Sequence, residues 1–150
     1  VLATDLYDNS VNIDLHTPDV DNIAFSIRLE TLPMAKVFAE SDYITIHVPS
    51  SDKPVIGAEE IDKLKDGVFL VNTSRGGTID EDVLLQALDS GKVAGAALDV
   101  FTNEPTPKNE LLNHPKISVT PHIGASTLEA QRNIGLELAD AFIDVFGENN

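Results

Sequence analysis

Short apolar runs alternate with amphipathic segments from Tyr43 to the end of the chain. Four of these runs are nearly continuous in apolar residues, as is typical of strands that are covered on both faces of a parallel sheet. They are residues 43–48, 68–72, 93–100 and 117–120. The segments between them have helical spacing, which is the order of β-α-β units. The pattern therefore predicts an α/β fold around a parallel sheet.

The helices of these units are predicted from their apolar spacing and their end residues. One covers residues 58–64 and another covers residues 81–89, where Gly91 is placed to end the helix in a left-handed backbone conformation. A shorter helix over residues 34–41 follows Pro33. These helices are expected to cover the sheet.

The last helix is predicted to run from the Ser126-Thr-Leu-Glu129 segment to about Phe146 and to stop at Gly147. Ser126 and Glu129 have the spacing of a capping box, in which each side chain satisfies a backbone amide. At 100° per residue, apolar residues fall on two opposite sides of this helix. They are Ala130, Ile134, Leu138, Ala141 and Val145 on one side, and Leu136 and Ile143 on the other. We therefore expect the helix to pack also on something outside this chain.

The first 42 residues are predicted as strands of a different kind. Apolar residues alternate with polar ones at positions 11, 13 and 15 and again at 23, 25, 27 and 29, so each stretch is expected to be a half-buried strand, with Pro18 between them. Residues 1–5 also have the composition of a strand. The chain begins inside this strand at Val1, without a Met, and we interpret that start as a cut.

Length and composition limit the classes of protein to which the chain can belong. Its 150 residues suit one domain, and 42% hydrophobic with 23% charged residues suits a soluble, cored globule. The formal net charge of -15 would repel a phosphate backbone, so nucleic acid and anionic membranes are not expected partners. The sequence has no cysteine, which excludes disulfides and thiolate metal sites and suits a cytoplasmic location.

Polar residues follow each predicted strand at its carboxyl end. Ligands of an open parallel sheet bind beyond these ends, so these residues are the first candidates for a site. They are Asp5, residues 47–49, residues 72–77, residues 99–105 and residues 120–124.

Taken together, these segments resemble the D-isomer-specific 2-hydroxyacid dehydrogenases, collinearly from about residue 40 to residue 146. The run TPHIGAST at residues 120–127 is most similar to the D-3-phosphoglycerate dehydrogenase branch. The resemblance implies a doubly wound, Rossmann-like α/β domain. It also implies that the complete enzyme transfers hydride between NAD and C2 of a D-2-hydroxy acid, 3-phosphoglycerate in that branch, and that it is a homo-oligomer.

The resemblance places three catalytic residues at Arg75, Glu104 and His122. An alcohol that is oxidised to a ketone must lose a proton as the hydride leaves, and the His122 imidazole is suited to accept it. A carboxylate bonded to that ring, assigned to Glu104, favours the protonated imidazole. The Arg75 guanidinium can bind the substrate carboxylate with two hydrogen bonds and polarise the neighbouring carbonyl.

The resemblance also assigns cofactor contacts. Asp5 is expected to accept hydrogen bonds from ribose hydroxyls, and its charge favours NAD over NADP because it would repel a 2′-phosphate. Asp99 is expected near the nicotinamide carboxamide. The remaining cofactor contacts are His47, Val48, Pro49, Thr73 and Gly124. No metal is expected, because His114 and His122 would need further ligands.

The chain departs from the family pattern in two ways. The G-x-G-x-x-G turn that precedes the strand ending in Asp5 is absent, and with it the helix N-terminus that holds the pyrophosphate. The substrate domain is also absent. Residues 1–150 are therefore predicted to be a single, incomplete NAD-binding domain that lacks the first βα unit. Residues 9–32 are longer than the family's connection and are either an insertion or a reorganisation of the sheet.

Several alternatives remain open from the sequence. The glyoxylate or hydroxypyruvate reductase branch has the same catalytic residues. A dehydrogenase-like corepressor, which senses NAD(H) and binds peptides, uses the same fold. An inert or engineered fragment would retain the motifs without activity. Taken alone, Arg75 could be a solvated loop cation, and Asp5 could be a turn former.

Overall fold

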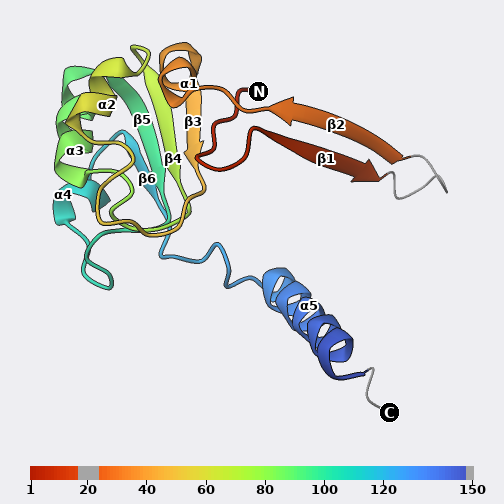
Figure 1. The fold of residues 1–150 in the computed structure, drawn as a ribbon. Coiled ribbons are helices and arrows are strands. Elements are labelled where there is room, and N and C mark those ends of the chain that lie inside the picture. The colour runs from red at the N-terminus through yellow and green to blue at the C-terminus, as the bar shows by residue number, and fades with distance from the viewer. Residues whose placement is uncertain (17–23, 148–150) are drawn as a thin grey trace.

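The computed structural model describes residues 1–16 and 24–147, and its main body is a four-stranded parallel sheet (Figure 1). The strands lie in the order β3-β4-β5-β6, and each neighbouring pair is parallel. They are β3 (Tyr43–Ile46), β4 (Val68–Asn72), β5 (Val93–Leu98) and β6 (Ile117–Val119). The predicted α/β class and its four strands are confirmed, with β3 and β5 ending two residues earlier than predicted and β6 one residue earlier.

Helices precede, connect and follow these strands, mostly as the sequence pattern predicted. They are α1 (Met34–Glu40), α2 (Ala58–Lys63), α3 (Glu81–Ser90), α4 (Asn109–Leu112) and α5 (Leu128–Phe146). Asp80 caps α3 by accepting hydrogen bonds from the backbone N–H groups of Asp82 and Val83. Gly91 ends α3 with φ of 82°, as predicted. The one-turn helix α4 was not predicted.

The core lies between one face of the sheet and helices α1 to α4. Leu70 on β4 and Leu84 and Leu88 on α3 have no exposed surface, and Leu111 of α4 and Phe38 of α1 join the same cluster. Burial of such side chains contributes most of the free energy that holds a layered domain together. The helices thus fix the positions of β4 and β5, the two strands that have neighbours on both sides.

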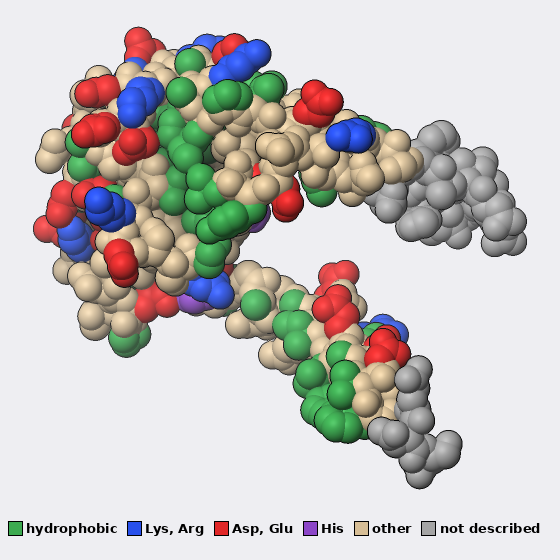
Figure 2. All heavy atoms as spheres, in the orientation of Figure 1, with side chains coloured by type: hydrophobic (Ala, Val, Ile, Leu, Met, Phe, Trp, Pro, Cys, Tyr) green, Lys and Arg blue, Asp and Glu red, His purple; other side chains and the backbone are tan. Residues whose placement is uncertain are grey.

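The opposite face of the sheet is open in the described part of the chain. Tyr43 is 72% and Phe69 41% exposed, and their rings stack on each other with centroids 5.2 Å apart. The prediction that the strands are covered on both faces is therefore wrong for these residues. Helix α5, the longest helix of the described residues, extends away from the sheet and leaves this face uncovered (Figure 1). Figure 2 shows hydrophobic side chains in a band on the main body and a further group on α5.

Two antiparallel strands form a separate ribbon that projects from the main body (Figure 1). β1 (Ser10–His16) pairs with β2 (Ala24–Glu30), and Ile13 lies opposite Ile27. The two predicted strands are confirmed over these residues, while Pro18 and Ile23 lie outside the described part. Since the ribbon does not join the parallel sheet, the structure favours an insertion over a reorganised sheet.

The strand predicted over residues 1–5 is wrong. This segment makes one parallel bridge, between Ala3 and Thr31, and the Leu32 N–H donates to the Ala3 carbonyl at 2.8 Å. A strand needs a ladder of such bonds along its length. The side of the segment that faces β3 borders a cavity instead of a neighbouring strand.

Helix α5 begins one residue later than the predicted capping box requires. Thr127 is the N-cap, and its hydroxyl accepts from the Ala130 N–H at 3.0 Å, whereas the Ser126 N–H donates to the Ile123 carbonyl. With the helix starting at Leu128, Glu129 lies too early in the first turn to complete the box. The capping-box assignment to Ser126 is therefore wrong by one position.

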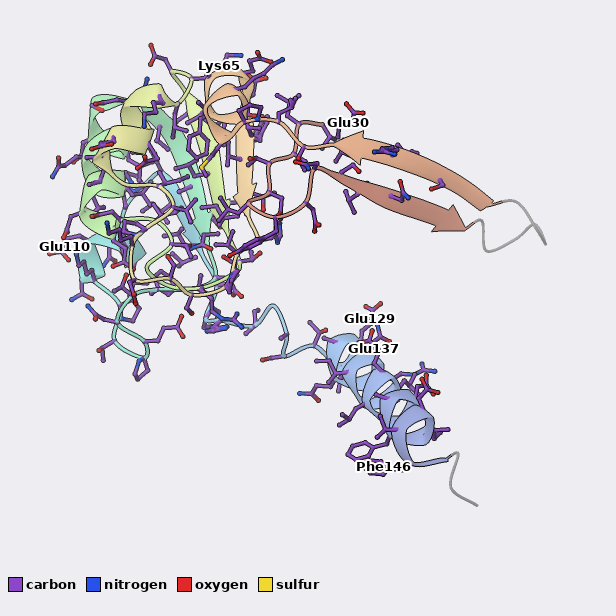
Figure 3. The ribbon with its side chains drawn as sticks, in the orientation of Figure 1. Glu30, Lys65, Glu110, Glu129, Glu137 and Phe146 are labelled. Carbon is purple, nitrogen blue, oxygen red and sulfur yellow. The ribbon has the colours of Figure 1, made fainter. Side chains whose placement is uncertain are left out.

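Both predicted apolar sides of α5 are exposed, and the helix contains no buried residue. Ile134 and Leu138 are 55% exposed on one side, and Ile143 is 63% exposed on the other. Figure 3 shows Glu129 and Glu137 on one side of α5 and Phe146 on another. Within the described residues, none of the helices combines the length and apolar character needed to cross a membrane.

Candidate catalytic and cofactor site

The four strands of the main sheet are parallel, so their carboxyl ends meet at one edge. The three candidate catalytic residues belong to the turns that follow β4, β5 and β6. Each turn is held by a polar side chain that bonds to backbone groups, as the following contacts show.

Glu104 and His122 are in direct contact. Glu104 Oε2 lies 2.7 Å from His122 Nδ1, and the other carboxylate oxygen accepts from the Phe101 N–H at 2.9 Å. The hydrogen bond with His122, together with the one from Phe101, holds the pKa of Glu104 below its ordinary value. A charged carboxylate thus orients the ring through Nδ1, and a substrate hydroxyl would have to approach Nε2.

His122 has a left-handed backbone conformation with φ of 53°, which is uncommon for a residue other than glycine. Asp99, at the end of β5, fixes this turn. Its carboxylate accepts from the Thr120 hydroxyl at 2.5 Å, from the Ile123 N–H at 3.0 Å and from the Gly124 N–H at 2.9 Å. Hydrogen bonds on both sides of His122 therefore maintain its strained conformation.

Asp99 is almost fully buried and carries a charge. Burial alone would raise the pKa of Asp99, but the hydrogen bonds from Thr120, Ile123 and Gly124 outweigh that effect and lower the pKa below its ordinary value. Both carboxylate oxygens are used in this arrangement. Asp99 is therefore an anchor of the turn that carries His122.

Asn72 holds the turn that carries Arg75. Its buried side-chain amide donates to the Arg75 carbonyl at 3.0 Å, and its oxygen accepts from the Ser74 N–H at 3.1 Å. The Thr78 hydroxyl also donates to the Arg75 carbonyl at 2.9 Å. The Arg75 side chain is exposed, and its Nη1 donates to the Ser74 carbonyl. The guanidinium is thus available at the surface on a rigid backbone.

The Arg75 and Glu104 turns are in contact through Gly76. A Cβ added to Gly76 would lie 1.9 Å from the Phe101 carbonyl oxygen and 3.0 Å from the Thr102 nitrogen. Only glycine permits this approach of two backbones. Among the described residues, no hydrogen bond joins the Arg75 guanidinium to Glu104 or His122. The structure therefore brings Glu104 and His122 together and places the Arg75 turn against the turn that carries Glu104.

Four of the predicted cofactor residues line one cavity of about 620 Å³ beside β3. They are Asp5, His47, Val48 and Pro49. His47 Nε2 lies 2.9 Å from the Thr45 hydroxyl. Residues 1–7 form one wall and β3 forms another. Thr73, by contrast, is exposed in the turn after β4, and Gly124 is bound to Asp99.

Asp5 also forms a turn. Its Oδ1 accepts from the Tyr7 N–H at 2.7 Å and from the Asp8 N–H at 3.0 Å, and these backbone hydrogen bonds lower the pKa of Asp5. The turn-former interpretation thus describes its contacts in this structure, and its place in the cavity wall keeps it accessible to a ligand. Among the described residues, no group of His, Asp or Glu side chains is arranged to hold a metal ion.

The role of Asn72 was missed by sequence reasoning, which used it only as part of a motif. A buried amide that ends an apolar strand was the available indication, because a buried polar side chain needs partners. The anchoring role of Asp99 was also missed, because the backbone N–H groups that bind its two carboxylate oxygens lie 24 and 25 residues later in the chain.

Comparison with known proteins gives consistent matches. The profile of the family described as "D-isomer specific 2-hydroxyacid dehydrogenase, NAD binding domain" matches residues 9–124. Hydroxypyruvate reductase of Thermotoga maritima is 46% identical over 135 residues, covering 87% of this chain and 42% of that protein. D-3-phosphoglycerate dehydrogenase of Bacillus subtilis is 45% identical over 119 residues, 78% of this chain and 23% of that protein.

Among solved structures, a glyoxylate reductase from Paecilomyes thermophila superposes with a TM-score of 0.67 at 41% identity. The match covers 72% of this chain and 34% of that one. The chain thus spans less than half the length of these relatives.

We expect Gly76→Ala to destabilise the protein by about 1–3 kcal/mol, because its methyl group would collide with the backbone of Phe101. Gly135→Ala is the matched control, since an added Cβ there meets nothing within 4 Å and alanine favours the interior of α5. Urea unfolding of both variants measures the difference. Equal stabilities of Gly76→Ala and wild type would contradict the close contact of the two turns.

Asp99→Asn is expected to lower the free energy of unfolding by about 1–3 kcal/mol at neutral pH. An asparagine has one acceptor oxygen, whereas both oxygens of Asp99 accept hydrogen bonds. The folded-state pKa of Asp99 is lowered, so its stabilisation is present above the ordinary value of 3.8 and is lost as the pH falls through the folded value. The difference in the free energy of unfolding between wild type and Asp99→Asn should therefore become smaller at acidic pH.

Urea unfolding at a series of pH values tests this expectation, with Asp62→Asn as an exposed control on α2. A gap that stays constant down to the lowest pH would mean that the charge of Asp99 does not hold the turn.

Proposed function

Because the chain belongs to the D-isomer-specific 2-hydroxyacid dehydrogenases, an NAD-dependent oxidoreductase family, we propose that it supplies the catalytic residues of such an enzyme. The reaction is hydride transfer between NAD and C2 of a D-2-hydroxy acid. The observation that carries the proposal is the contact of Glu104 with His122, beside the turn that carries Arg75.

The proposed chemistry follows from the geometry of these groups. Nδ1 of His122 is bound to Glu104, so Nε2 accepts the hydroxyl proton of the substrate during oxidation and returns it during reduction. The charged Glu104 stabilises the imidazolium that forms. Arg75 binds the substrate carboxylate and stabilises negative charge on the C2 oxygen. NAD, when bound, supplies or accepts the hydride.

The residues present fit part of NAD. Asp5 and residues 47–49 line a cavity that would hold a ribose of the cofactor, and the Asp99 turn lies near the proposed catalytic residues. The pyrophosphate has no such fit, because the sequence contains no G-x-G-x-x-G turn. The proposed nicotinamide and ribose contacts are Asp5, His47, Val48, Pro49, Thr73, Asp99 and Gly124, of which Asp99 and Gly124 bond to each other in this structure.

We propose that residues 1–150 form one incomplete NAD-binding domain and that the substrate domain and the Gly-rich βα unit lie outside them. Two observations support this. The chain spans 42% of the T. maritima relative. Among the described residues β3 is an edge strand, and the cavity between it and residues 1–7 lies on the side where a further parallel strand would pair.

The substrate is proposed to be 3-phosphoglycerate, in keeping with the similarity to the B. subtilis dehydrogenase. Hydroxypyruvate or glyoxylate is the second candidate, because the T. maritima reductase is similar at 46% identity and the fungal glyoxylate reductase at 41%. Turnover of the full-length enzyme with 3-phosphoglycerate, hydroxypyruvate and glyoxylate would separate the two. The substrate with the largest kcat/KM decides between the branches.

The enzyme is also proposed to be a homo-oligomer. The support is the exposed apolar surface of α5, on which Leu128 is 87% and Phe146 65% exposed.

Substitution of the catalytic residues tests the proposal in the full-length enzyme. His122→Asn should lower kcat by about 10²–10⁴-fold, the range for loss of an acid/base group. Arg75→Ala should both lower kcat and raise KM, because it removes a substrate contact.

His114→Asn and Arg132→Ala are matched controls. His114 also contacts a carboxylate, that of Asp89 at 3.4 Å, but lies before β6, away from the catalytic turns. Arg132 lies on the exposed helix α5. Normal turnover of His122→Asn would remove that residue from the mechanism.

Calorimetric titration of this chain with NADH, run beside gel filtration, tests cofactor binding. Weak binding, or none, is expected, because the pyrophosphate lacks its helix N-terminus. Binding of NADH at nanomolar affinity would contradict the proposal that the cofactor site of this chain is incomplete.

Two further outcomes concern the full-length protein. If it binds NADH but turns over no 2-hydroxy acid, an NAD-sensing corepressor is favoured. If it is a monomer at all concentrations, the proposed homo-oligomer is contradicted.

A further inference from the structure

Glu81 is a buried acid that none of the roles above uses. It is the first residue of α3, and only 8% of its surface is exposed. Its Oε1 accepts a hydrogen bond from the Thr102 N–H at 2.7 Å, across 21 positions of sequence. The contact therefore ties the start of α3 to the turn that follows β5.

That turn carries Glu104. The Phe101 N–H donates to Glu104 and the next N–H, of Thr102, donates to Glu81. Two consecutive amides are thus bound to two different carboxylates. Gly76 packs against the same two residues from the Arg75 turn. The backbone at Phe101 and Thr102 is held from three directions.

We propose that Glu81 is a positioning residue, which fixes the 101–104 turn so that the Glu104 carboxylate meets Nδ1 of His122. The inference rests on the proposed roles of Glu104 and His122 and adds a residue that acts through them. Glu81 itself touches neither the ring nor the proposed substrate site.

The burial of Glu81 supports a specific role. A buried carboxylate is costly unless it is bonded, and an apolar side chain would fill the same space without that cost. The position offsets part of the cost, since the N-terminus of the ten-residue helix α3 favours negative charge. Lys108, which is bound to the neighbouring Asp82 at 2.6 Å, also attracts this charge. The side chain at this position can therefore accept the hydrogen bond from the Thr102 N–H.

Three variants separate positioning from general stability. Glu81→Met has similar size and helix propensity but no acceptor oxygen, so it removes the hydrogen bond and leaves the core filled. Glu81→Gln retains an acceptor oxygen and is the conservative rescue. Asp82→Asn removes a neighbouring charge from the same first turn of α3 without touching Thr102, and it controls for the helix dipole.

The first measurement needs no activity. The proton on a hydrogen-bonded imidazole nitrogen gives a low-field NMR resonance, which reports the His122 to Glu104 contact in this chain. We expect the resonance in wild type, Glu81→Gln and Asp82→Asn, and its loss by broadening in Glu81→Met. We also expect slow hydrogen exchange of the Thr102 amide in wild type.

The second measurement is turnover of the full-length enzyme. We expect Glu81→Met to lower kcat by about 10- to 100-fold with KM changed less than about twofold, because the base is misplaced while the substrate contact of Arg75 remains. Glu81→Gln should recover most of the loss.

The outcomes distinguish the two proposals. An unchanged resonance in Glu81→Met, or rapid exchange of the Thr102 amide in wild type, overturns the positioning role whether or not the enzyme is active. Loss of the resonance in a protein that turns over no 2-hydroxy acid in any form leaves the positioning of Glu104 intact and overturns the proposed function. If Glu81→Met does not fold, hydrogen exchange of the Thr102 amide in wild type still tests the bond to Glu81. Rapid exchange of that amide overturns the proposal.

Discussion

The edge of the sheet that carries the candidate catalytic residues depends on one interaction, the acceptance of three hydrogen bonds by the Asp99 carboxylate. Asp99 ends β5, and its partners Thr120, Ile123 and Gly124 all belong to the turn after β6. It therefore joins two neighbouring strands at their carboxyl ends. The strained backbone of His122 lies between these bonded groups, so the position of the proposed base depends directly on them.

Side-chain hydrogen bonds to the backbone also hold the other turns of the candidate site. Asn72 holds the Arg75 turn, Glu81 holds the Thr102 N–H, and Glu104 holds the Phe101 N–H while it binds His122. In each case a side-chain amide or carboxylate satisfies backbone groups that the end of a strand leaves unpaired. The turns are thus rigid for the same reason that the strands are, because their backbone hydrogen bonds are made.

Local pattern predicted the elements that depend on local chemistry. β4, α3 and the left-handed Gly91 were found correctly because each is specified by consecutive residues. The prediction of a strand over residues 1–5 was wrong because a strand needs a pairing partner, which the local sequence does not specify. The predicted N-cap of α5 was wrong by one residue because Ser126 and Thr127 are both favourable N-cap residues. The candidate catalytic residues were assigned by family resemblance, not by local pattern. The anchoring contact of Glu81 spans 21 positions and had no local indication.

The two parts of the proposed site differ in how well the described residues hold them in place. The turns with Arg75, Glu104 and His122 follow β4, β5 and β6, and β4 and β5 are paired on both sides over a filled core. The proposed cofactor cavity lies instead beside the edge strand β3, where residues 1–7 provide a wall that makes one bridge, from Ala3 to Thr31 just after β2. The preformed turns of the candidate catalytic residues cost little entropy on binding, while an open cofactor cavity must be ordered when the cofactor binds. Affinity for NAD should therefore depend on the proposed further strand beside β3 far more than the geometry of Arg75, Glu104 and His122 does.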